Sequence, residues 1–164
     1  MFLSDSTMRD LLVEWASFYS NHAVVRTLVT FAHIGGLVAA AGAATTIDRG
    51  LLFAAGRGSD TGWRAQLAAT RSTHGFVLWG LALVTVSGLL LLAADFDAYW
   101  ASRVFWVKMA LIALLIVNGA ALTWSERRAS SGNTSAWRPL RWTAALSIAL
   151  WTLTTLAGVA LLNM

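Results

Sequence analysis

The chain has 164 residues, of which 57% are hydrophobic and 12% charged, with a formal net charge of +4. A soluble domain carries about twice that charged fraction, so the composition argues against a soluble globular fold and favours a membrane protein. The absence of Cys excludes disulfides and thiolate metal sites, and the basic excess is better explained by membrane topology than by nucleic-acid binding.

The amino-terminal stretch, residues 6–20, predicts a short amphipathic helix. Its apolar residues recur at helical spacing on one face, while Asp10 and Glu14 lie on the other. We expect this helix to lie on the outer membrane surface, and packing against a partner protein is the alternative. The face consists of Met8, Leu11, Leu12, Trp15, Phe18 and Tyr19.

Four apolar runs follow, and each has the roughly 20 residues that a bilayer crossing requires. Backbone polar groups in lipid must be satisfied within the segment, so all four are expected to be helices. The predicted fold is therefore all-α, an integral membrane four-helix bundle with an amino-terminal interfacial helix, in one domain covering 1–164. The spans are about 24–47, 73–94, 104–124 and 142–162.

Arginines set the predicted orientation. The loops 48–72 and 125–141 are rich in Arg, whereas the remaining segments outside the spans hold only Arg9 and Arg103. The positive-inside rule then makes both Arg-rich loops cytoplasmic and both termini external. The loop arginines are Arg49, Arg57, Arg64 and Arg71, followed by Arg127, Arg128, Arg138 and Arg141.

The first span carries a histidine on a face of small residues. Gly36, Ala40 and Ala44 follow His33 at three, seven and eleven residues, which places all four on one side of a helix. Because small residues let membrane helices approach closely, His33 is predicted to face the bundle. Asp48, next to Arg49 at the end of the span, is interpreted as part of a topology anchor.

Two further residues lie at a depth similar to that of His33. His33 is expected roughly 13 Å below the outer boundary, and Lys108 and Met109 roughly 6 to 8 Å below it. Imidazole binds haem iron and methionine is a known second ligand, so His33 opposite Met109 is a candidate haem site. A five-coordinate tetrapyrrole on His33 alone is another, and a hydrogen bond from His33 to a hydroxyl or backbone carbonyl is the structural alternative.

Lys108 needs a partner if it lies inside the span, and Asp95 or Asp97 would provide one. The alternative is that Lys108 extends outward to the interface.

His22 shares a face with His33 if the helix is continuous, about 16 Å away along it. His74 opens the second span from the other side, too far in depth to share a metal with His33.

The fourth span predicts a second inward stripe, made of Ser147, Trp151, Thr154 and Gly158. No Ser-His-Asp arrangement, glycine-rich phosphate loop or pair of metal-binding carboxylates is found, so no catalytic residue is assigned and it stays open whether the protein is an enzyme.

Three stretches resemble small four-helix bacterial membrane families, namely the CopD-type copper-resistance domain, the HemJ-type protoporphyrinogen oxidase and a related uncharacterised family. They are "FAHIGGLVAAAG", "ATRSTHGFVLWGLALVTVSGLLL" and "SRVFWVKMALIALLIVNG". The resemblance implies a haem-associated or copper-associated role in a bacterial inner membrane, with His33 and Lys108 matching the HemJ-type histidine and lysine. The chain lacks the periplasmic Met and His richness of the first family and the aromatic and basic motif of the second.

Three functional hypotheses follow. The first is a tetrapyrrole-binding protein, with haem b, acting in electron transfer or haem-linked redox; its candidate residues are His33, Met109, Lys108, His22 and His74, with His33 on the metal. The second is a non-catalytic subunit of a larger respiratory or photosynthetic complex, and a homo-oligomer is the alternative assembly. The third is copper handling or small-solute transport.

Overall fold

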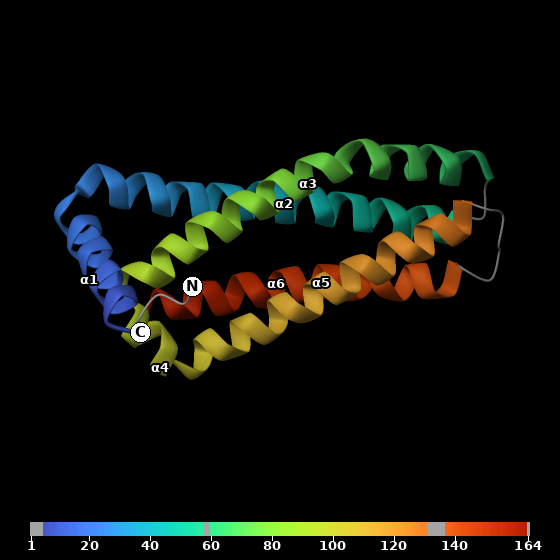
Figure 1. Ribbon diagram of the computed structural model, residues 1–164. Helices are drawn as coiled ribbons and strands as arrows, with labels where there is room; N and C mark the ends of the chain where they lie inside the picture. Colours follow the sequence, from blue (N-terminus) through green and yellow to red (C-terminus); the bar gives the residue numbers. More distant parts are fainter. Residues whose placement is uncertain (1–4, 58–59, 131–136, 164) are drawn as a thin grey trace.

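The computed structural model describes residues 5–57, 60–130 and 137–163, and the regular elements in this part of the chain are all α-helices, as predicted. Each predicted span coincides with one long helix, and the predicted amino-terminal helix is also present (Figure 1). The helices are α1 (Asp5–Asn21), α2 (Ala23–Arg57), α3 (Asp60–Ala94), α4 (Phe96–Ala101), α5 (Arg103–Ser130) and α6 (Trp137–Leu161).

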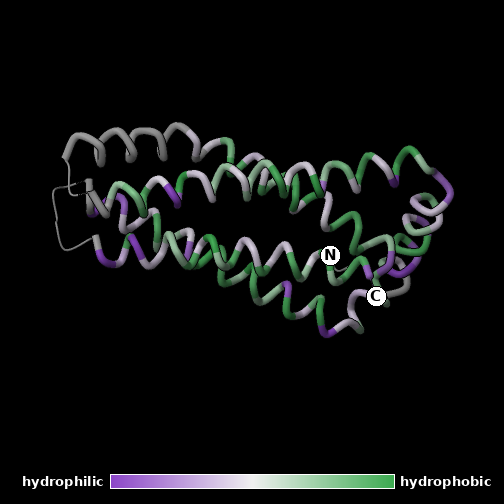
Figure 2. The backbone as a smooth tube through the Cα atoms, turned by 180° about the vertical axis from the view of Figure 1, so that it is seen from behind, coloured by the Kyte–Doolittle hydropathy of each residue, from purple (hydrophilic) through white to green (hydrophobic). Residues whose placement is uncertain are grey.

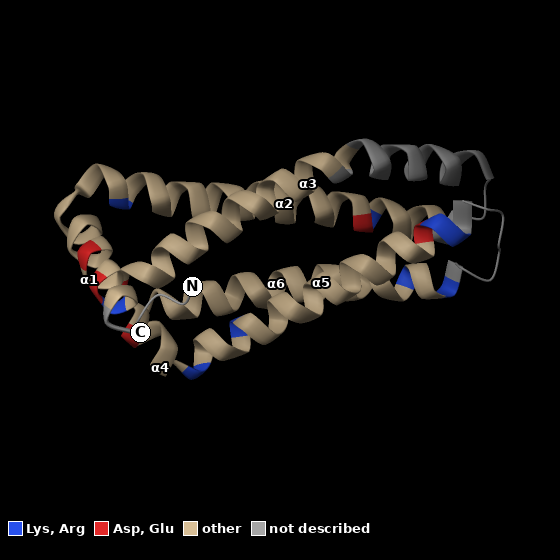
Figure 3. Cartoon of the chain, viewed as in Figure 1, with Lys and Arg blue, Asp and Glu red and all other residues tan. Residues whose placement is uncertain are grey.

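The long helices have the length and composition of membrane spans. Four segments qualify, and large apolar side chains point away from the bundle along them; Trp79, for example, is 79% exposed. Figure 2 shows hydrophobic residues along the middle of the long helices, and Figure 3 shows most charged residues near their ends. Such a surface is stable in lipid, so this is a multi-pass membrane protein. The segments are Ala23–Ala54, Gly75–Ala94, Arg103–Arg128 and Arg138–Leu161.

The prediction that residues 48–72 and 125–141 form loops is too long at both places, because most of these residues are helical. α2 continues to Arg57, α3 begins at Asp60, α5 continues to Ser130 and α6 begins at Trp137. An apolar run ends where the hydrocarbon ends, but a helix continues as long as no residue breaks it, and Ala, Arg, Leu and Gln favour helix. The short helix α4 was also not predicted.

The four long helices form two antiparallel hairpins, α2 with α3 and α5 with α6. Contacts between α2 and α6 join the hairpins (Figure 1). α1 lies across one end of the bundle against α3 and α2, and α4 contacts α3 and α5. We call this the α1 end, and the other the far end.

α1 is tied to the bundle by a hydrogen bond. The indole Nε1 of Trp15 donates to the backbone carbonyl of Leu90 on α3 over 2.9 Å. The predicted amphipathic helix therefore packs on its own chain through Trp15, while Met8 and Leu11 of the same face, and Val13 on the opposite side, stay exposed.

α2 and α3 cross where both helices carry glycine. A Cβ added to Gly80 would lie 3.0 Å from the Cβ of Ala40 and 3.2 Å from the backbone oxygen of Gly36. Gly36 is equally restricted, since its Cβ would lie 3.2 Å from the oxygen of Gly80. This contact confirms that the small-residue face of the first span is a helix-packing surface.

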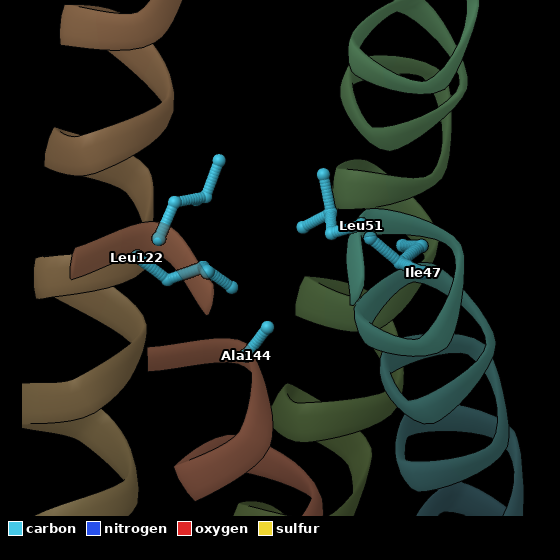
Figure 4. Packing of buried hydrophobic residues seen from close by; sticks show 5 residues of the cluster. Ile47, Leu51, Leu122 and Ala144 are labelled. Atoms are coloured by element: carbon cyan, nitrogen blue, oxygen red, sulfur yellow. The ribbon is translucent and has the colours of Figure 1, made fainter. Parts of the chain in front are cut away.

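The far half of the bundle holds a cluster of larger aliphatic side chains. Ile47 and Leu51 of α2 lie opposite Leu122 of α5 and Ala144 of α6 (Figure 4). Leu140, at the start of α6, completes the cluster and is 1% exposed. These residues join the two hairpins near the far end.

Candidate functional site

His33 lies on α2 toward the α1 end, half-buried against α3. Its Nδ1 is 3.2 Å from the backbone oxygen of Val84 and 3.2 Å from Oγ of Ser87. Gly88 makes room for the ring, because a Cβ there would lie 3.1 Å from Cε1 of His33. The hydrogen bonds are those expected of an inward histidine joined to a carbonyl and a hydroxyl.

The two partners of His33 determine which ring nitrogen carries the proton. The carbonyl of Val84 only accepts, so Nδ1 must donate to it. Ser87 donates its own proton to the oxygen of Leu83 at 2.6 Å, which leaves its oxygen to accept from Nδ1. In the neutral ring Nε2 then carries the lone pair, which is the form that binds a metal.

Lys108 lies on α5 at the same end of the bundle. It is half-buried, and its Nζ would be 3.6 Å from a Cβ added to Gly158 of α6. The ammonium group is close enough to act electrostatically on the ring of His33. The structure therefore places His33 and Lys108 at the same end of the bundle on different hairpins, with Gly158 leaving space for the lysine chain.

The predicted partners of Lys108 are not found beside it. Asp95 and Asp97 are exposed, and within the described residues no ion pair joins either of them to Lys108. Asp95 instead acts on Tyr99 of α4. Burial raises the pKa of the Tyr99 phenol, and the nearby Asp95 and Tyr19 raise it further.

The other predicted ligands lie less favourably. Met109 is half-buried, but as the neighbour of Lys108 it is turned by about 100° around the helix. His22 is exposed at the junction of α1 and α2, where its Nδ1 lies 2.8 Å from the oxygen of Phe18. The chain is not continuously helical there, so His22 does not share a helix face with His33. His74 belongs to α3, and its side chain lies outside the described part.

The interpretation of Asp48 as part of a topology anchor at the end of the span does not account for its burial. Its side chain is 1% exposed and accepts a hydrogen bond from Ser147 of α6, whereas Arg49 is exposed. α2 does not end at Asp48 but continues for more than two turns, with the buried Leu51 in the next one. The signal was in the spacing, because Asp48 follows Ala44 by four residues and so lies next to it on the same side of the helix.

The predicted inward stripe of α6 is confirmed. Ser147, Trp151 and Thr154 are buried, and Gly158 is half-buried. Two polar atoms in this region, Oδ2 of Asp48 and Oγ1 of Thr154, are buried without a hydrogen-bond partner among the described residues. The stripe therefore connects the level of Asp48 with that of Lys108.

The described side chains do not gather three or more His, Asp or Glu residues into a metal-binding group. Comparison with protein-family models, curated proteins and solved structures finds no match for this chain.

Proposed function

We propose that this membrane protein binds a b-type haem at the α1 end of the bundle, with Nε2 of His33 as an axial ligand, and acts in electron transfer or haem-linked redox chemistry. The observation that carries the proposal is the orientation of His33. A carbonyl and a hydroxyl on α3 hold Nδ1 at 3.2 Å each and so direct the lone pair to Nε2. Histidines that ligate metals commonly donate their other N–H to such partners.

Lys108 supports the same proposal through its charge. A haem carries two anionic propionates, and a cation in a low-dielectric site stabilises an anion. Lys108 is half-buried, acts electrostatically on His33 and has no ion-pair partner in Asp95 or Asp97 within the described residues. A propionate is a counterion of the required charge, and Met109 is the candidate for a second axial ligand on the same helix.

The type of membrane and the orientation of the chain in it are part of the same proposal. We place the protein in a bacterial inner membrane with both termini outside, because Arg-rich segments are retained in the cytoplasm. The α1 end, with His33, then lies in the outer half of the membrane. The resemblance of His33 and Lys108 to the HemJ-type pair agrees with a haem-linked role.

The test is the absorption spectrum of the protein purified in detergent from haem-replete cells. We expect a Soret band that is lost in His33→Ala and retained in His22→Ala, a matched control at an exposed histidine. The ferric spectrum of Met109→Leu shows whether methionine is the second ligand. A wild-type protein that is colourless, and that does not take up added haemin, would leave His33 with only its helix-joining role and would refute the proposal.

A subunit role in a larger membrane complex is the second candidate, favoured by the free surface of α1. Met8, Leu11, Val13 and Phe18 are exposed apolar residues on a helix that already packs on the bundle through Trp15. Blue-native electrophoresis after mild solubilisation tests this role. Comigration with large partners, lost when Leu11 and Val13 are replaced by Ser, is the expected result; migration only as a small particle contradicts it.

A further inference from the structure

We propose that Asp48, together with Ser147, forms a proton-binding site inside the far half of the bundle. This proposal does not depend on haem binding at His33. Asp48 lies 15 residues along α2 from His33, which corresponds to about 22 Å. The two sites are therefore separate in space.

The first observation is that Asp48 is buried with an open oxygen. The residue is 1% exposed, Ser147 donates a hydrogen bond to its carboxyl group, and Oδ2 has no hydrogen-bond partner among the described residues. An unpaired carboxylate in a membrane interior is costly, and ionisable groups at such positions commonly belong to proton pathways. The open oxygen is the atom on which a proton resides.

The second observation is a polar atom on the same inward stripe. Oγ1 of Thr154 is also buried without a partner among the described residues. Thr154 lies seven residues beyond Ser147 on α6, two turns or about 10 Å away. Buried polar atoms without protein partners are where proteins hold ordered water, and such water carries protons to a buried carboxyl group.

Other charged groups near this level do not provide a cation for Asp48 within the described residues. Arg49 on α2 and Arg141 on α6 are exposed, whereas Glu126 on α5 is buried and carries the same sign of charge as Asp48. On α3, the side chains of residues 60–72 and 74 lie outside the described part. The reaction is a simple exchange, in which the carboxylate takes up a proton from water to form a neutral carboxylic acid and returns it to water.

The experiment is infrared spectroscopy of the full chain in liposomes, as a function of pH. We expect a carbonyl band of a protonated carboxylic acid that falls about tenfold for each pH unit above its midpoint and is absent in Asp48→Asn. Asp97→Asn, at an exposed aspartate, is the matched control and keeps the band. A hydrophobic carbodiimide applied to the wild-type protein gives a second measurement, since it modifies protonated carboxyl groups; we expect an adduct on Asp48.

Ser147→Ala tests the pairing. The hydroxyl donates to the carboxylate, so its loss should move the midpoint of the band to higher pH, while Thr155→Val, whose hydroxyl bonds within α6 to Trp151, should not. A band that is the same in wild type and Asp48→Asn at every pH would overturn the proposal. Loss of the band on adding sodium, but not choline, at constant pH would also overturn it, because the ligand would then be a metal cation.

Discussion

The two ends of the bundle differ in how they hold a polar side chain between apolar helices. At the α1 end, His33 lies beside a crossing of small residues and its Nδ1 is paired with groups of α3. In the far half, Asp48 lies among larger aliphatic side chains such as Leu51, and one carboxyl oxygen is left open. In both places a serine of the neighbouring helix is the partner: Ser87 accepts a hydrogen bond from the histidine, and Ser147 donates one to the aspartate.

The comparison distinguishes the contacts that hold the helices together from the polar atoms that remain available for chemistry. In lipid, helices gain little by hiding apolar groups from one another, so close packing and hydrogen bonds provide the association energy. Backbone contact at Gly36 and Gly80 holds the helices together toward the α1 end. Side-chain packing around Leu51 and Leu122 holds them together in the far half.

The largest effect is expected at the glycine crossing. Gly80→Leu would force a side chain against the backbone of α2, because a Cβ added at this position would already lie 3.2 Å from the nitrogen of Ala40. Such overpacking costs about 3 kcal/mol, at the upper end of the usual range, because the helices must separate. Thermal unfolding in detergent measures the loss. Gly42→Leu is the control, since a Cβ added at Gly42 would meet nothing within 4 Å. Equal destabilisation by both variants would contradict a close contact between α2 and α3 at Gly80.

Removal of aliphatic volume in the far half should have the next largest effect. Leu51 is 1% exposed and lies in the cluster with Leu122 and Ala144. Leu51→Ala is expected to reduce the free energy of unfolding by about 2 to 3 kcal/mol, through the lost contacts and the remaining cavity. Phe53→Ala, two residues along and 60% exposed, should change it little. A larger loss in Phe53→Ala would place the core on the wrong face of α2.

Loss of the α1 anchor should have a smaller and local effect. Trp15→Phe keeps the aromatic ring but removes the donor to the carbonyl of Leu90. A buried hydrogen bond contributes about 1 kcal/mol, so we expect faster hydrogen exchange and earlier proteolysis within α1, with little change in the long helices. Trp79→Phe, at a tryptophan that is 79% exposed, is the control. Unchanged exchange in α1 would show that its apolar contacts alone hold it.

The sequence was informative wherever lipid imposes a rule. The apolar runs predicted the four spans, and the spacing of Gly36 and Ala40 after His33 predicted the packed face of α2. The helix ends were not predictable in the same way, because hydropathy marks the membrane boundary and not the end of a helix. Asp48 was missed for the same reason, since the end of the apolar run was taken as the end of the packed face.

The surroundings of Lys108 could not be predicted either. Asp95 was near in sequence and in expected depth, but the direction of a long side chain depends on where the opposite helix leaves space, and Gly158 of α6 provides that space. The sequence placed Lys108 at a depth similar to that of His33, but the arrangement of the two hairpins, which no local pattern encodes, decides which side chains surround it.

The smallest effect concerns a polar contact of the far half. The side-chain amide of Asn118 donates from Nδ2 to the carbonyl of Thr143 over 2.9 Å, joining α5 to α6. Hydrogen bonds between membrane helices average about 0.6 kcal/mol, so Asn118→Leu should lower the unfolding free energy by about that amount. Thr123→Val, which removes a hydroxyl bonded only within α5 to Gly119, is the control. A loss as large as that of Leu51→Ala would mean that polar contacts hold the far half together. A small loss would mean that the aliphatic cluster provides most of the stability of the far half. Proton exchange at Asp48 would then not loosen the bundle.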